Sequence, residues 1–170
     1  MEYDLPGRFP AHCCDSINRI AAFQLHIADA YLSMVCHYNA EDRLPALALY
    51  FNDHAERKRE NAKRFLRFLR RHECRVLLPF LKRPDQWVTG MNALTYALEL
   101  EKELYDMLQD LRSTTSLIGE DELFDFLQMF VDEQRKNITF LEHELARSNS
   151  ETPAVTFGEH SESQCEQHNP

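Results

Sequence analysis

Seven polar side chains fall on the apolar faces of predicted helices, where an interior residue would ordinarily be apolar. They are Gln24, Tyr31, His54, Lys58, Asn61, Glu101 and Gln134. Each lies near the middle of its helix, so in a four-helix bundle these side chains converge on one interior zone. The zone is either an internal binding site or a set of core polar groups that form hydrogen bonds with one another.

The chemistry to test first at such a zone is metal binding. A carboxylate-bridged di-iron site in a bundle needs a Glu from each of two helices and a Glu-x-x-His unit from each of the other two. None of the eight histidines has an acidic residue three positions before it. The inward set has one carboxylate, Glu101, and a cation, Lys58. A lysine at a metal position repels the metal, so we predict an internal ion pair between Lys58 and Glu101.

Apolar residues at alternating spacings of three and four predict the helices that must position this zone. The predicted helices run from Asp15 to Tyr38, from after Pro45 to about His72, from Gly90 to about Ser113, and from after Glu120 to Ala146. The first and third connections are too short to cross a helix of roughly 42 Å, so each joins an antiparallel pair. The connection from Cys74 to Thr89 can span roughly 53 Å when extended, and it makes the second and third helices parallel. This is the all-α, ferritin-like bundle topology with one long crossover.

The remaining sequence predicts short ends and reduced cysteines. We expect an extension over residues 1–14, the bundle over 15–147, and a polar, disordered tail over 148–170. The five cysteines are odd in number and lack Cys-x-x-Cys spacing, so free thiols are expected. No signal pattern or membrane-length apolar run occurs, which favours a cytoplasmic protein without membrane contact.

Charge is unevenly distributed. The formal net charge of −9 predicts repulsion of nucleic acid unless a local basic face exists. Between His54 and Arg75 the chain carries nine basic residues and three acidic ones. Such a run is either a solvated helix face or a surface that binds polyanions.

Several short motifs together resemble the ferritin family over about residues 15–147. They are Ala30-Tyr31-Leu32-Ser33-Met34, Lys58-Arg59-Glu60, Lys82-Arg83-Pro84-Asp85 with Trp87, Met91-Asn92-Ala93, Leu100-Glu101-Lys102 and Glu133-Gln134. The resemblance implies iron storage and assembly with other ferritin subunits or with copies of this chain. It implies iron as the ligand, although the residues themselves require none.

The resemblance also implies roles for the interior residues. Heavy chains of animal ferritins place a di-iron ferroxidase centre at the positions matching Gln24, Tyr31, Lys58, Asn61, Glu101 and Gln134. Tyr31, Glu101 and Gln134 keep the family's residue types and are the remaining candidate metal ligands. Gln24 and Lys58 replace glutamates, and Asn61 replaces the histidine. Lys58-Arg59-Glu60 is similar to the non-catalytic light chains.

Departures from the family pattern leave two functions open besides a third, an active oxidase, against which the single inward carboxylate argues. The cavity-facing glutamates of light chains are mostly replaced by Arg57, Lys63 and Arg64, and no short fifth helix is recognisable after Arg147. Asp125 is the candidate channel residue. We expect a non-catalytic ferritin subunit with a degenerate ferroxidase centre. The alternative is a helical bundle repurposed for binding or structure, with the basic second helix contacting polyanions.

Overall fold

The computed structural model describes residues 9–40, 45–81 and 90–151. It contains the helices α1 (Ala11–Ala40), α2 (Pro45–Arg71), α3 (Gly90–Ile118) and α4 (Asp121–Glu151). No strand occurs within these ranges, so the predicted all-α fold is confirmed. None of the helices that the structure describes is both long and apolar enough to cross a membrane.

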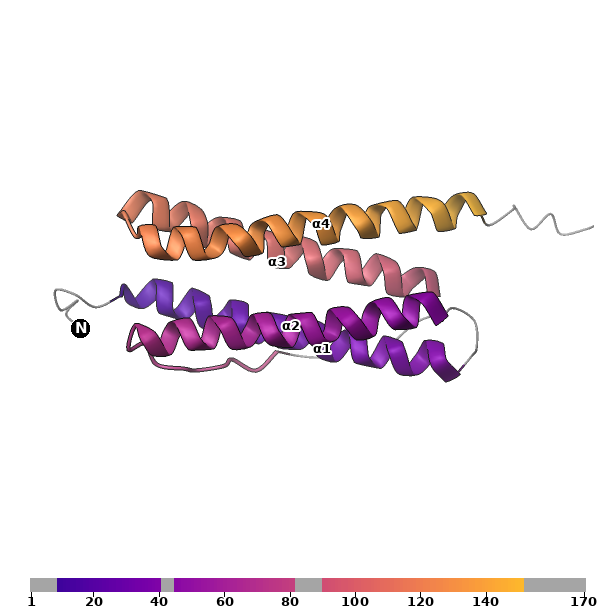
Figure 1. The fold of residues 1–170 in the computed structure, drawn as a ribbon, viewed down its shortest axis with the longest axis horizontal. Coiled ribbons are helices and arrows are strands. Elements are labelled where there is room, and N and C mark those ends of the chain that lie inside the picture. Colours follow the sequence, from indigo (N-terminus) through magenta and orange to yellow (C-terminus); the bar gives the residue numbers. More distant parts are fainter. Residues whose placement is uncertain (1–8, 41–44, 82–89, 152–170) are drawn as a thin grey trace, which may run out of the picture.

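The helices form two antiparallel pairs, α1 with α2 and α3 with α4 (Figure 1). α2 and α3 run in the same direction, as the length of the connection between them predicts. From the end of α2, residues 74–81 turn back along the first pair without helical structure. Residues 82–89, which include the Lys82-Arg83-Pro84-Asp85 motif and Trp87, lie outside the described residues.

Three helix ends differ from the predicted boundaries by four or more residues. α1 begins at Ala11, where the Pro10 carbonyl accepts the backbone N–H groups of Cys13 (3.0 Å) and Cys14 (3.2 Å). α3 continues to Ile118 and ends at Gly119, whose φ of 74° is the left-handed conformation that glycine adopts without strain. α4 continues to Glu151, so the first residues of the predicted tail are helical. The rest of the tail and residues 1–8 lie outside the described residues.

The core consists of the apolar faces that the three-and-four spacing predicts. The largest fully buried apolar side chains include Ile17, Ile27, Met34, Phe51, Phe65, Phe68, Leu69, Leu104 and Leu108. Leu47, Leu98 and Leu145 are only partly buried at the edge of this core. Side-chain burial therefore supports the helix register on which the convergence of the polar residues depends.

Aromatic rings fill the interface between α2 and α4. The Phe65 ring lies 5.0 Å from Phe126 and 4.5 Å from Phe130, measured between centroids. Nearer the other end of the bundle, Tyr50 stacks on Phe140 at 4.6 Å. Aromatic side chains therefore account for much of the packing between these two helices.

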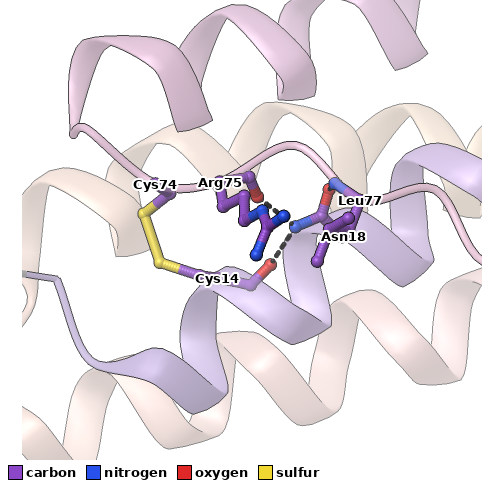
Figure 2. The surroundings of a disulfide bond; sticks show 5 residues. All are labelled: Cys14, Asn18, Cys74, Arg75 and Leu77. Atoms are coloured by element: carbon purple, nitrogen blue, oxygen red, sulfur yellow. Dashed lines mark hydrogen bonds between the residues drawn. A yellow bond between two sulfur atoms is a disulfide. The ribbon is translucent and has the colours of Figure 1, made fainter. Parts of the chain in front are cut away.

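The expectation that the cysteines are free is wrong for two of them. Cys14 and Cys74 form a disulfide across 60 residues of sequence, while Cys13 and Cys36 are free (Figure 2). The antiparallel pairing of α1 and α2 brings the start of α1 beside the end of α2, and this proximity has no signature in cysteine spacing.

Asn18 fixes the same segment beside the disulfide (Figure 2). Its Nδ2 donates to the Arg75 carbonyl at 2.8 Å, and its Oδ1 accepts the Leu77 N–H at 2.9 Å. One side chain thus satisfies a backbone donor and a backbone acceptor of the crossover, which holds residues 75–77 against α1.

Candidate functional site

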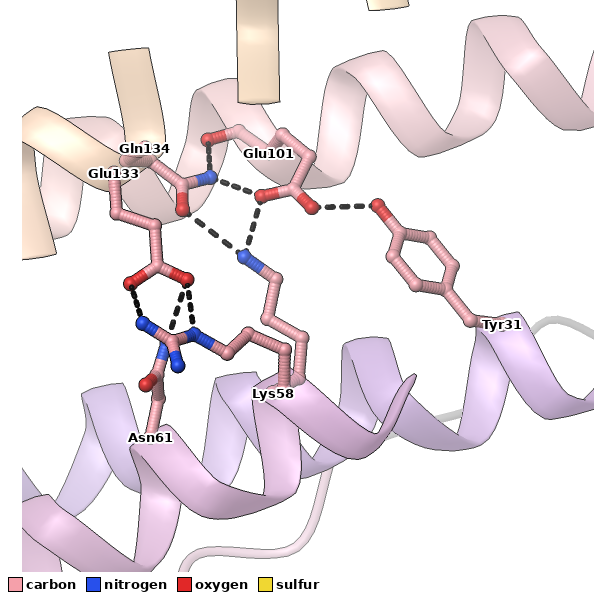
Figure 3. Close-up of polar contacts among 7 residues, drawn as sticks. Tyr31, Lys58, Asn61, Glu101, Glu133 and Gln134 are labelled. Atoms are coloured by element: carbon pink, nitrogen blue, oxygen red, sulfur yellow. Dashed lines mark hydrogen bonds and ion pairs between the residues drawn. The ribbon is translucent and has the colours of Figure 1, made fainter. Parts of the chain in front are cut away.

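The predicted ion pair between Lys58 and Glu101 is present in the centre of the bundle (Figure 3). Lys58 Nζ lies 2.7 Å from Glu101 Oε2, and the two side chains are 1% and 0% exposed. They come from α2 and α3. A buried charge is tolerated only when it is paired and hydrogen-bonded, and each of these groups is the counterion of the other.

Tyr31 and Gln134 complete the hydrogen bonding around the pair. The Tyr31 hydroxyl donates to Glu101 Oε1 at 2.7 Å. Gln134 Oε1 accepts from Lys58 Nζ at 3.0 Å, while its Nε2 donates to the Glu101 carbonyl at 2.7 Å and also to Oε2. Burial, together with the charge of Glu101 and the bond to it, raises the pKa of Tyr31 well above its usual value. Tyr31 is therefore held as a neutral donor.

A second polar group lies at the edge of this zone, around Glu133 of α4. Arg57 Nε donates to Glu133 Oε1 at 2.8 Å, and Asn61 Nδ2 donates to the same oxygen at 3.3 Å (Figure 3). Burial raises the pKa of Glu133, but the hydrogen bond and charge of Arg57, with help from Asn61 and Lys58, outweigh it and lower the pKa below its usual value. Asn61 therefore donates its hydrogen bond to this outer group and, among the described residues, forms none with Lys58 or Glu101.

Gln24 and His54 face the interior with unused polar atoms. Gln24 is 2% exposed. Among the described residues, neither Gln24 Nε2 nor His54 Nδ1 has a hydrogen-bond partner. The His54 ring lies 4.1 Å from Tyr50, and burial lowers the pKa of His54 despite the opposing charge of Glu101. Neither residue takes part in the bonds that connect Lys58, Glu101 and Gln134.

Two further carboxylates, Asp125 and Glu133, are not part of the fully buried zone. Asp125, the candidate channel residue, is exposed on α4, away from the buried zone. Glu133 was missed as a site residue because it lies beside the apolar stripe of its helix and is 19% exposed. The sequence feature that could have indicated Glu133 as a site residue is the pair Arg57 and Asn61, which lie four residues apart on one face of α2.

The donor set does not fit a di-iron centre. The buried zone has one carboxylate, and both of its oxygens already accept hydrogen bonds. The lysine ammonium lies between Glu101 and Gln134, where a cation would need ligands. In the part of the chain that the structure describes, no three His, Cys, Asp or Glu residues are grouped so as to hold a metal ion.

Comparisons with known proteins agree with this architecture. The family model described as a ferritin-like domain matches residues 14–149. The chain is 32% identical to the middle subunit of ferritin from Salmo salar, over 79% of this chain and 78% of that protein. It is 32% identical to the soma ferritin of Lymnaea stagnalis over 72% of each chain. It is 29% identical to the lower subunit of ferritin from Aquarana catesbeiana, over 75% of this chain and 76% of that protein.

Proposed function

This chain belongs to the ferritin family, and we propose that it is a non-catalytic subunit acting in iron storage in the cytoplasm. Its partners are other ferritin subunits or further copies of itself. Iron is the material that the assembly stores and is not a cofactor held in the interior of this chain. The ferroxidase centre is degenerate in this proposal.

The observation that supports the loss of oxidase activity is the contact of Lys58 with Glu101 and Gln134. At 2.7 and 3.0 Å the ammonium uses the oxygens that an iron ion would need. Binding Fe²⁺ there would require the lysine to leave or to lose its proton, and Glu101 would then be the one carboxylate facing the metal. Tyr31, Glu101 and Gln134 are thus retained as a hydrogen-bonded polar core.

A strip of exposed apolar side chains supports the proposal that the chain assembles. Along the crossover, Val76, Leu77, Leu78 and Phe80 are 40%, 57%, 45% and 94% exposed. Contiguous exposed apolar residues are typical of surfaces that other protein chains cover. We assign this strip to a contact between subunits.

The test of the catalytic part measures oxidation of ferrous iron in air by the purified chain. We expect the rate of the protein-free control, because Glu101 is the one fully buried carboxylate among the residues that the structure describes. A triple variant that restores the family's residue types, Gln24→Glu, Lys58→Glu and Asn61→His, should oxidise iron faster, whereas Arg59→Glu on the helix surface should not. If the unaltered chain oxidises iron and Glu101→Gln abolishes that oxidation, the proposal is overturned.

The test of the assembly part is native mass measurement after co-expression with a catalytic ferritin subunit. Mixed assemblies containing both chains are expected. If this chain is recovered only as a monomer, with or without the second subunit, the alternative of a repurposed bundle module is favoured instead. Where mixed assemblies form, the amount of iron that they retain should increase with their content of the catalytic subunit, since this chain contributes to the shell but does not oxidise iron.

A further inference from the structure

Three arginines form a row on α2 that borders an open hollow. Arg64, Arg67 and Arg71 line this hollow together with Phe126 of α4, and its volume is about 370 Å³. Steps of three and four residues keep the side chains on one face of a helix. At 1.5 Å per residue, the row extends over about 10 Å along the helix axis.

The arginine row differs from the earlier part of α2, where the basic side chains Arg57, Lys58, Arg59 and Lys63 all have carboxylate partners. Earlier in α2, Arg57 pairs with Glu133 at 2.8 Å, Arg59 with Glu56 at 3.0 Å and Lys63 with Glu60 at 3.4 Å. Within residues 9–40, 45–81 and 90–151, no carboxylate forms an ion pair with Arg64, Arg67 or Arg71. Three adjacent positive charges therefore face the hollow without neutralisation.

Aromatic contacts hold two of these guanidinium groups. Arg64 is half-buried and lies 4.8 Å from the centroid of Phe130, and Arg71 lies 5.6 Å from that of Phe68. Stacking on a ring positions a guanidinium and leaves its edge N–H groups available as donors. Arg67 and Arg71 are exposed, so a ligand can reach the row.

We propose that the arginine row binds an oligophosphate group, with successive phosphates lying along α2. Arginine donates two parallel hydrogen bonds to phosphate oxygens, and a chain of linked phosphates presents several negative charges over the length of the row. The net charge of −9 does not prevent this. Salt screens distant charges beyond about 10 Å, so the local row determines the potential at the hollow.

Isothermal titration with sodium tripolyphosphate, in about 50 mM salt, tests the proposal. We expect saturable binding that weakens as salt is raised. The double variant Arg67→Gln/Arg71→Gln should weaken binding by about tenfold or more for each arginine, because each loses charge-assisted hydrogen bonds. The matched control is Arg59→Gln/Lys63→Gln, which removes the same charge from the same helix at paired positions and should leave the affinity within about twofold.

The outcomes separate specific binding from general charge attraction. Both double variants change exposed residues, so thermal melting should confirm that each remains folded. If ATP binds and the same two substitutions abolish that binding, the result would support recognition of a chain of phosphates by the arginine row. Equal weakening in both double variants, absence of tripolyphosphate binding, or binding of single-stranded oligonucleotides but not of tripolyphosphate would each overturn the proposal. These results are independent of the proposed storage function.

Discussion

Lys58 introduces a full positive charge into the core, and one carboxylate balances it. Taking both groups out of water is unfavourable, so the pair itself contributes little net stability. Removing one partner is different, because the other charge then stays buried without compensation. The interior of this chain is consequently sensitive to any substitution that changes the charge of the pair.

Glu101→Gln should lower the free energy of unfolding by about 3–5 kcal/mol, because it strands the Lys58 ammonium. Urea unfolding followed by circular dichroism measures this. The double variant Lys58→Met/Glu101→Gln removes both charges and should recover most of the loss. Glu60→Gln, in a pair whose side chains are 59% and 55% exposed, should cost less than about 1 kcal/mol. Wild-type stability in Glu101→Gln would show that the pair is not a buried ionic contact.

His54 should make stability depend on pH near neutrality. Burial lowers the pKa of His54 below its ordinary value of 6.5. The unfolded chain therefore binds the proton at a higher pH than the folded chain does, and stability falls as pH drops below about 6.5. In His54→Gln, stability measured by urea unfolding should fall less steeply over this range. His12→Gln, at an exposed position, serves as the control; equal slopes in all three proteins would contradict the prediction.

Helical periodicity was sufficient to predict the buried residues of the site. Each of the four buried residues replaces an apolar residue in the regular stripe of its helix: Tyr31, Lys58, Glu101 and Gln134. The stripe is defined by residues that are close together in the sequence, so it can be recognised without knowing the fold. Periodicity assigned Asn61 to the same group, whereas the structure bonds it to Glu133 at 3.3 Å. The choice between two neighbouring carboxylates depends on side-chain rotamers, which the spacing of residues does not determine.

At the scale of the elements, two helices end in the left-handed conformation, one with glycine and one without. α3 ends at Gly119, and the Glu120 N–H donates to the Thr115 carbonyl at 3.0 Å. After α2, Glu73 has a φ of 58° while the Cys74 N–H donates to the Leu69 carbonyl at 2.9 Å. Both are Schellman-type ends, but a side chain at the left-handed position costs about 1–2 kcal/mol.

Glu73→Gly should therefore raise the free energy of unfolding by about 1 kcal/mol, and Gly119→Ala should lower it by a similar amount. At Gly119 an added Cβ would meet no atom within 4 Å, so the expected loss comes from the backbone alone. Glu73→Ala is the control, since it removes the same charge but keeps a Cβ. Thermal unfolding measures all three, and equal gains from Gly and Ala at position 73 would refute the backbone explanation.

The disulfide acts on the first helical pair by joining the start of α1 to the end of α2. A crosslink that closes a loop of 60 residues should stabilise the fold by about 4 kcal/mol, mainly by restricting the unfolded chain. Cys14→Ser should lose this stability, and its melting temperature should no longer respond to dithiothreitol. Cys36→Ser, at an exposed free thiol, should melt like the unaltered protein and keep its response to the reductant. An unaltered protein that melts at one temperature with and without reductant would contradict this.

At the scale of the whole molecule, connection lengths predicted the topology because geometry leaves few options. A short connection forces an antiparallel pair, and only the residues between Cys74 and Thr89 are long enough to run back along the bundle. The pairing of Cys14 with Cys74 follows from that topology together with the exact ends of the helices. Those ends could not be read from the sequence, since α1 begins inside the segment expected to precede the bundle.

The exposed crossover strip gives a last prediction about assembly. Phe80 is 94% exposed, so Phe80→Ser should change the stability of the isolated chain by no more than about 0.5 kcal/mol. If the strip lies between subunits, losing this anchor should weaken association by about 2 kcal/mol, roughly thirtyfold. Analytical ultracentrifugation over a range of protein concentrations measures the shift toward smaller species. Leu117→Ser is the matched control, because Leu117 is 88% exposed but lies outside the strip, at the end of α3 near the turn to α4. A similar shift in both variants would indicate a general loss of surface hydrophobicity, and no shift in Phe80→Ser would remove the crossover from the subunit contact.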